Sequence, residues 1–120
     1  MKVLVADDSG VMRKIILRSL FAVGVSDCVE AANGQEALDI FKLHEFDLVI
    51  TDWNMPEKSG LELTEELRAL GTTVPIIMVT TESQKSQVVR AIQAGITDYL
   101  TKPFDNEVLR SKLDRYVPAQ

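Results

Sequence analysis

Five short apolar runs recur along the chain at intervals of roughly 20 to 25 residues. They are too short for buried helices, and several are nearly continuous in Val, Ile and Leu, as strands covered on both faces are. The stretches between them carry apolar residues at three- and four-residue spacing, which is typical of amphipathic helices. We predict strands at 2–6, 25–30, 46–51, 75–80 and 97–101, and helices at 11–23, 33–44, 59–70, 83–94 and 105–117.

The helices are expected to turn their apolar residues towards a sheet. Gly24, Gly71 and Gly95 follow three of them, where a terminating glycine is common. The inward positions predicted for the first helix are Val11, Ile15, Ile16, Leu20 and Phe21, with Arg13, Lys14 and Arg18 interleaved. Those predicted for the fourth helix are Val88, Val89 and Ile92.

Alternating strands and helices predict a doubly wound, five-stranded parallel α/β sheet. The common order for five strands is 2-1-3-4-5, with its switch point between strands 1 and 3. No linker or repeat is visible, so residues 1–120 are expected to form one domain. The chain ends at Gln120, just past the last expected helix, which favours a complete single-domain protein over a domain cut from a longer one.

Bulk composition excludes several classes of function. The net charge of −5 argues against direct binding to nucleic acid and leaves no polybasic patch for a membrane surface. No apolar run approaches the ~20 residues of a membrane span, and the N-terminus lacks a signal-peptide pattern. A single Cys28 excludes an internal disulfide and fits a reducing cytoplasm. We expect a cytoplasmic protein without membrane insertion.

Polar side chains stand at the carboxyl ends of four expected strands. Asp7 and Asp8 follow strand 1, and Asp52 follows strand 3 within the run Asp52-Trp53-Asn54-Met55-Pro56. Thr80 ends strand 4, and Lys102 follows strand 5. In the order 2-1-3-4-5 these residues meet in one crevice at the switch point, where open α/β sheets bind ligands.

Three carboxylates in one crevice need a counterion, because crowded like charges are costly in a poorly solvated site. The Lys102 ammonium can neutralise part of this negative charge, and a hard divalent cation can neutralise the rest. Oxygen ligands without nearby His or Cys favour Mg²⁺, with Mn²⁺ as the alternative. We assign Asp7, Asp8 and Asp52 as metal binders, with a backbone carbonyl at Asn54 completing the shell.

This combination of carboxylates, an ammonium, a hydroxyl and a divalent cation suits phosphoryl transfer. Asp52 would be the nucleophile, while Lys102, the Thr80 hydroxyl and the metal would neutralise charge on the transferring group. The loop after strand 1 lacks the glycines of a dinucleotide or Walker loop, and its two acids would repel a bare phosphate or a flavin phosphate. An aspartyl-phosphate phosphatase would want a second acid near Asp52, where this chain has Asn54.

These residues resemble the receiver domain of two-component response regulators, a family with the flavodoxin-like fold. The resemblance covers essentially the whole chain and rests on the acidic pair after strand 1, Asp52, Thr80 and Lys102-Pro103. The Asp52-to-Pro56 run and Tyr99 are closest to the single-domain chemotaxis regulators. Those regulators are themselves an example of the order 2-1-3-4-5, so the order and the resemblance are not independent predictions.

The resemblance implies a phosphorelay switch rather than a turnover enzyme. Asp52 would take a phosphoryl group from a sensor histidine kinase with Mg²⁺ present, and a cis peptide would precede Pro103. Thr80 would then bond the phosphoryl group and Tyr99 would move inward. The surface of helix 4, strand 5 and helix 5 would change and bind a target such as a flagellar motor component. Asn54 and Glu82 would influence the rate of dephosphorylation, in which a phosphatase could also take part.

Several alternatives stay open at this point. The output could be motor binding, relay to a second phosphotransfer protein, or regulation within a longer protein. A metal-dependent phosphate hydrolase is the rival from another class, and a degenerate scaffold is disfavoured because every site residue is present. We expect a monomer, with dimerisation through helices 4 and 5 on activation left open. Trp53 is expected either to pack over its loop or to lie exposed beside the site.

Overall fold

The sheet has the predicted order and direction. In the computed structural model, which describes residues 1–117, five parallel strands are arranged β2-β1-β3-β4-β5. The expectation about Gln120 lies outside the described residues. The strands are β1 Lys2–Ala6, β2 Asp27–Ala31, β3 Leu48–Asp52, β4 Ile76–Thr80 and β5 Asp98–Thr101.

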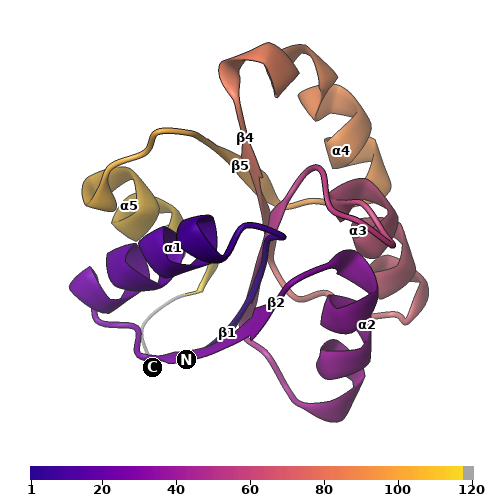
Figure 1. The fold of residues 1–120 in the computed structure, drawn as a ribbon, viewed down its shortest axis with the longest axis horizontal. Helices are drawn as coiled ribbons and strands as arrows, with labels where there is room; N and C mark the ends of the chain where they lie inside the picture. The colour runs from indigo at the N-terminus through magenta and orange to yellow at the C-terminus, as the bar shows by residue number, and fades with distance from the viewer. Residues whose placement is uncertain (118–120) are drawn as a thin grey trace.

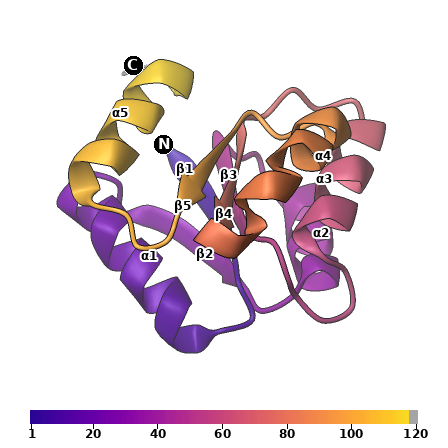
Figure 2. The same ribbon diagram turned by 90° about the horizontal axis from the view of Figure 1, so that it is seen from above.

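Helices cover both faces of this sheet, as Figures 1 and 2 show. On one face lie α1 (Gly10–Ala22) and α5 (Asn106–Tyr116). On the other lie α2 (Gly34–Leu43), α3 (Gly60–Ala69) and α4 (Val88–Ala94). The two faces carry separate clusters of buried side chains, one around Leu4, Val49 and Met78 and one around Val5, Ile50 and Val79. The central strands are therefore apolar on both sides, which explains their continuous apolar runs.

The second strand begins later than its apolar pattern suggested. The prediction placed its start at Val25, whereas the β1–β2 ladder begins with Lys2 opposite Asp27. Val25 is buried, but it lies before the ladder and packs beside α1 and β1. Burial in a turn therefore produced the same sequence signal as burial in a strand.

The predicted helix at 83–94 is wrong in its first half. Residues Glu82–Gln87 form a 3₁₀ helix, η1, and α4 begins only at Val88. None of the side chains of η1 is buried. Because most helical stability in proteins comes from packing an apolar face, this polar segment has little to hold it in a longer α-helix.

Several apolar helix positions predicted to face inward are exposed. On α1 only Ile16 and Leu20 are buried, while Val11 and Phe21 are 74% and 71% exposed. A step of one residue turns a helix by roughly 100°, so neighbours of the buried stripe point well away from it. Val89 and Ile92 on α4 are exposed in the same way. The apolar stripes predicted to face inward on α1 and α4 were therefore too wide.

No helix among residues 1–117 is long and apolar enough to cross a membrane.

Candidate functional site

Three carboxylates converge where β1 and β3 end. The two strands are hydrogen-bonded neighbours with Ala6 opposite Thr51, so Asp7 leaves β1 beside Asp52, the last residue of β3. Asp8 follows directly. One carboxylate oxygen from each of Asp7, Asp8 and Asp52 lies within 4.8 Å of the others. The structure thus brings the predicted acidic residues together.

Asp7 is the buried member of this group, with only 1% of its surface exposed. Its Oδ1 accepts a 2.9 Å hydrogen bond from the backbone N–H of Ser9, whereas Oδ2 is buried without a hydrogen-bond partner in the described chain. Burial raises the pKa of Asp7, and the charges of Asp52 and Asp8 raise it further, against the lowering effects of the Ser9 N–H and the Lys102 ammonium. Asp7 Oδ2, which is buried and has no hydrogen-bond partner in the described chain, can therefore accept a cation as a ligand.

Lys102 faces the acids from the end of β5. Its Nζ lies 3.3 Å from Asp52 Oδ1 and 4.0 Å from Asp7 Oδ2. Its backbone N–H donates a 2.7 Å hydrogen bond to the Thr80 carbonyl, which ties it to the end of β4. The Lys102–Pro103 peptide is cis, as the resemblance implied. One ammonium against three carboxylates leaves the site with a net negative charge.

Thr80 ends β4 at the same edge of the sheet, whereas Tyr99 lies within β5, two residues before its end. Thr80 is fully buried at the end of β4, and its hydroxyl has no hydrogen-bond partner among residues 1–117. Tyr99 is half-buried on β5 opposite Met78, with the Lys112 ammonium 5.7 Å from its ring centroid. No hydrogen bond joins either residue to the carboxylates in the described chain, so their predicted roles remain predictions.

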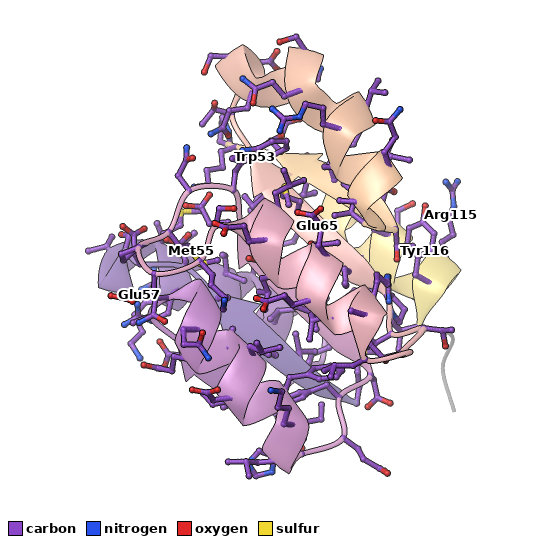
Figure 3. All side chains as sticks on the ribbon, turned by 90° about the vertical axis from the view of Figure 1, so that its right-hand side faces the viewer. Trp53, Met55, Glu57, Glu65, Arg115 and Tyr116 are labelled. Carbon is purple, nitrogen blue, oxygen red and sulfur yellow. The ribbon has the colours of Figure 1, made fainter. Side chains whose placement is uncertain are left out.

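The loop after Asp52 carries Trp53, Met55 and Glu57, which are labelled in Figure 3, and leads into α3. Trp53 is 7% exposed and packs into the core, which decides between the two placements expected for it, while Asn54 is exposed. Gly60, at the start of α3, donates its N–H to the Trp53 carbonyl at 2.8 Å. A Cβ on Gly60 would lie 2.1 Å from the Asp52 carbonyl oxygen. Only glycine lets α3 approach the Asp52 backbone this closely, and sequence reasoning had treated it as a helix start alone.

Comparison with known proteins agrees with this geometry. The family described as "Response regulator receiver domain" matches residues 3–114. The chain belongs to this family. A receiver domain therefore accounts for the sheet, its order and the placement of the acids.

Individual relatives of this receiver domain are similar over nearly their whole length. A "Chemotaxis protein CheY homolog" of Campylobacter jejuni is 48% identical and covers 95% of this chain and 90% of its own. "Chemotaxis protein CheY1" of Helicobacter pylori is 44% identical and covers 95% and 94%. Among solved structures, Vibrio cholerae CheY4 superposes with a TM-score of 0.87 at 35% identity and covers 97% and 98%.

The group of three carboxylates in the receiver domain fits a hard divalent cation. It offers oxygen donors from Asp7, Asp8 and Asp52, one of them buried and unpartnered, and excess negative charge. Mg²⁺ prefers this donor set and commonly takes only one or two carboxylates together with waters.

Two further residues of the receiver domain support the acidic loop and were missed by sequence reasoning. Arg13 on α1 hydrogen-bonds the backbone carbonyl of Asp7, and Glu30 on β2 accepts from the same guanidinium. The helical pattern had assigned Arg13 to the polar face. Its partner lies 17 residues away and comes close only through the β1–β2 pairing, so no local signal could have found it.

Proposed function

We propose that residues 1–120 are a single-domain phospho-acceptor switch in which Asp52 receives a phosphoryl group from a sensor histidine kinase. The observation that carries the proposal is the convergence of Asp7, Asp8 and Lys102 on Asp52 at one edge of the sheet. The CheY relatives support chemotaxis as the process. Relay to a second phosphotransfer protein, or service within a longer regulator, are the alternative outputs.

The charges around Asp52 suit the transfer of a phosphoryl group to its carboxylate. An Asp52 carboxylate oxygen forms the new P–O bond, the P–N bond to the donor histidine breaks, and the leaving imidazole takes up a proton. Lys102, 3.3 Å from Asp52 Oδ1, is placed to neutralise charge on the acceptor side. Asp7, Asp8, Asp52 and the Asn54 carbonyl would hold Mg²⁺, with Mn²⁺ as the alternative. When bound, the cation supplies charge neutralisation for the phosphoryl oxygens.

The output side of the proposal involves Thr80 and Tyr99. The Thr80 hydroxyl, buried and unpartnered in the described chain, has free donor capacity for a phosphoryl oxygen. Tyr99 would move inward behind it and alter the surface formed by α4, β5 and α5. Exposed Val89 and Ile92 on α4 supply that surface with apolar contact area for a protein target such as a flagellar motor component.

The proposal has no direct role for nucleic acid or a membrane, and it places a monomer in the cytoplasm. The proposed function is not that of a turnover enzyme. Asn54, two residues beyond Asp52, is exposed and carries an amide, so it does not supply the second acid that rapid hydrolysis of an aspartyl phosphate would use. A separate phosphatase could shorten the life of the phosphorylated form.

Phosphoryl labelling tests the proposal. A small radiolabelled phosphoryl donor should label the wild type in Mg²⁺ and not in excess chelator, and Asp52→Asn should lose the label. Asp39→Asn, an exposed carboxylate on α2, is the matched control and should label like the wild type.

Two outcomes contradict the proposal in different ways. Undiminished labelling of Asp52→Asn would place the acceptor elsewhere. Release of many equivalents of phosphate per protein from one donor would favour the rival, a metal-dependent phosphate hydrolase.

A further inference from the structure

Arg13 lies beneath the acidic loop although it belongs to the exposed helix α1. Its Nη1 donates a 2.7 Å hydrogen bond to the backbone carbonyl of Asp7, and its Nε donates a 3.0 Å bond to Glu30 Oε1. The guanidinium also underlies Gly10, whose Cβ position would be 3.5 Å from Nη2. One side chain therefore spans the loop that carries Asp7 and Asp8 and the neighbouring strand β2.

The hydrogen-bonded carbonyl matters because of its place in the chain. It belongs to the planar peptide that joins Asp7 to Asp8, so holding its oxygen orients the start of Asp8. The Asp7 N–H donates to the Ala31 carbonyl of β2 at 3.1 Å, so the other side of Asp7 is held as well. Asp8 is exposed, and its side chain makes no hydrogen bond within residues 1–117. The direction of Asp8 therefore depends on how the Asp7–Asp8 peptide is held.

Glu30 makes this arrangement compatible with a cation site. A lone guanidinium beside the acids would repel a divalent ion, but Glu30 pairs with Arg13 at 3.0 Å and with Lys14 at 2.8 Å. Both contacts act to lower the pKa of Glu30, with the hydrogen bond from Lys14 the strongest of the influences. The carboxylate offsets the charge of Arg13 and fixes the plane of its guanidinium.

We propose that Arg13, held by Glu30, is a positioning residue for the cation site, because its hydrogen bond to the Asp7 carbonyl sets where the Asp7 and Asp8 side chains lie. The proposal rests on the proposed function in one respect, namely that these acids bind Mg²⁺. It goes further by assigning metal affinity to a side chain that cannot itself bind a cation.

The charge of Arg13 makes the test discriminating. Removing a positive charge near a cation site should strengthen Mg²⁺ binding, whereas loss of a positioning contact should weaken it. Residues that support metal ligands commonly change affinity by 10- to 100-fold, and we expect Arg13→Gln to lose about tenfold. Lys14→Gln is the matched control. It removes the same charge from the same helix and the same Glu30, but the Lys14 side chain is 65% exposed and makes no hydrogen bond to the loop in the described residues.

The experiment is a Mg²⁺ titration of the full chain followed by the fluorescence of Trp53, the single tryptophan, which adjoins Asp52. We expect the dissociation constant to rise for Arg13→Gln and to stay equal or fall for Lys14→Gln. Arg13→Lys keeps the charge but not the planar fork that reaches two partners, so it should fall between wild type and Arg13→Gln. If Arg13→Gln does not fold, Arg13→Lys is the variant whose Mg²⁺ affinity is compared with that of the wild type.

Phosphoryl labelling supplies the second readout. In Arg13→Gln the Mg²⁺ concentration for half-maximal labelling should rise, while the rate at saturating Mg²⁺ should approach that of the wild type. A general loss of structure would lower the plateau instead, and that result would overturn the assignment.

The possible failures are distinguishable. A wild type that does not respond to Mg²⁺ would overturn the proposed function and this inference together. A normal wild-type response with unchanged or tighter binding by Arg13→Gln would overturn the role of Arg13 alone. Equal weakening by Arg13→Gln and Lys14→Gln would also overturn it, because the effect would then not depend on the contact with Asp7.

Discussion

Asp7 shows at the scale of a single residue how a binding site can oppose stability. It is buried with one unpartnered oxygen, beside two other carboxylates and a single ammonium. Burial and these like charges raise its pKa. A carboxyl whose pKa is higher in the folded than in the unfolded protein destabilises the fold when ionised, and the penalty disappears as pH falls below its unfolded value. The charge excess that would attract a cation therefore weakens the metal-free protein.

Asp7→Asn should consequently raise the stability of the metal-free protein at neutral pH. The amide oxygen can keep the hydrogen bond from the Ser9 N–H, while the buried charge is removed. We expect an increase on the order of 1 kcal/mol in the free energy of unfolding, the usual size of the effect of a single substitution. Urea unfolding without Mg²⁺ measures it. The advantage over wild type should shrink in acid, where wild-type Asp7 is itself protonated, and a constant difference across pH would contradict the explanation.

At the scale of elements, a polar cluster joins the edge strand β5 to α5. Asp98 Oδ2 accepts hydrogen bonds from Lys112 Nζ and the Tyr116 hydroxyl, both 2.9 Å long, and Oδ1 accepts from the Tyr99 N–H at 2.8 Å. Burial acts to raise the pKa of Asp98, but these three hydrogen bonds and the Lys112 charge outweigh it, and the pKa is lowered. The cluster therefore stabilises the fold above the unfolded pKa of the carboxyl and loses its effect as pH falls through the folded value.

Tyr116→Phe should show this dependence directly. Loss of a hydrogen bond to a charged group should lower the free energy of unfolding by about 1.5–3 kcal/mol at neutral pH. The difference from wild type should narrow as acid protonates Asp98 and the carboxylate contribution is lost from both proteins. Urea unfolding at a series of pH values measures it. Tyr99→Phe is the control, because the Tyr99 hydroxyl has no hydrogen bond in the described residues. A Tyr116→Phe deficit that stays constant into acid would refute a role for the carboxylate.

The elements also show where sequence patterns stop being informative. Periodicity located each helix, but it could not tell that α1 buries only the Ile16–Leu20 stripe or that the polar residues before Val88 adopt a 3₁₀ helix. Both outcomes depend on which neighbour covers each element. The contact of Arg13 with Glu30 was hidden for the same reason, since only the β1–β2 pairing brings Glu30 near the start of α1. Local patterns specify elements, and tertiary packing decides which faces are used.

At the scale of the whole molecule, the parallel sheet accounts for most of what could be predicted about the site. Asp7, Asp52, Thr80 and Lys102 lie far apart in sequence, yet parallel strands deliver all their carboxyl ends to one edge. Given the order β2-β1-β3-β4-β5, their neighbourhood follows without knowledge of any side-chain contact. Distances, burial and the unpartnered oxygen of Asp7 required the structure, because small shifts in strand twist and helix approach set them.

Net charge and site charge lead to different predictions for cations. The chain carries −5 at neutral pH, so any salt should relieve some general repulsion. Mg²⁺ bound by Asp7, Asp8 and Asp52 should stabilise the folded state beyond this, by about 1.4 kcal/mol at ten times its dissociation constant. We therefore expect the Tm in MgCl₂ to exceed the Tm in NaCl of equal ionic strength, as measured by thermal unfolding.

The Asp8→Asn variant separates the two effects within one protein. It removes a ligand and leaves most of the net charge. The rise in its Tm with NaCl should therefore match that of the wild type, whereas the rise in its Tm with MgCl₂ should fall towards the value in NaCl. Equal stabilisation of the wild type by the two salts would mean that Mg²⁺ acts only through screening. In that case the convergence of Asp7, Asp8 and Asp52 would not constitute a cation site, whatever their proximity.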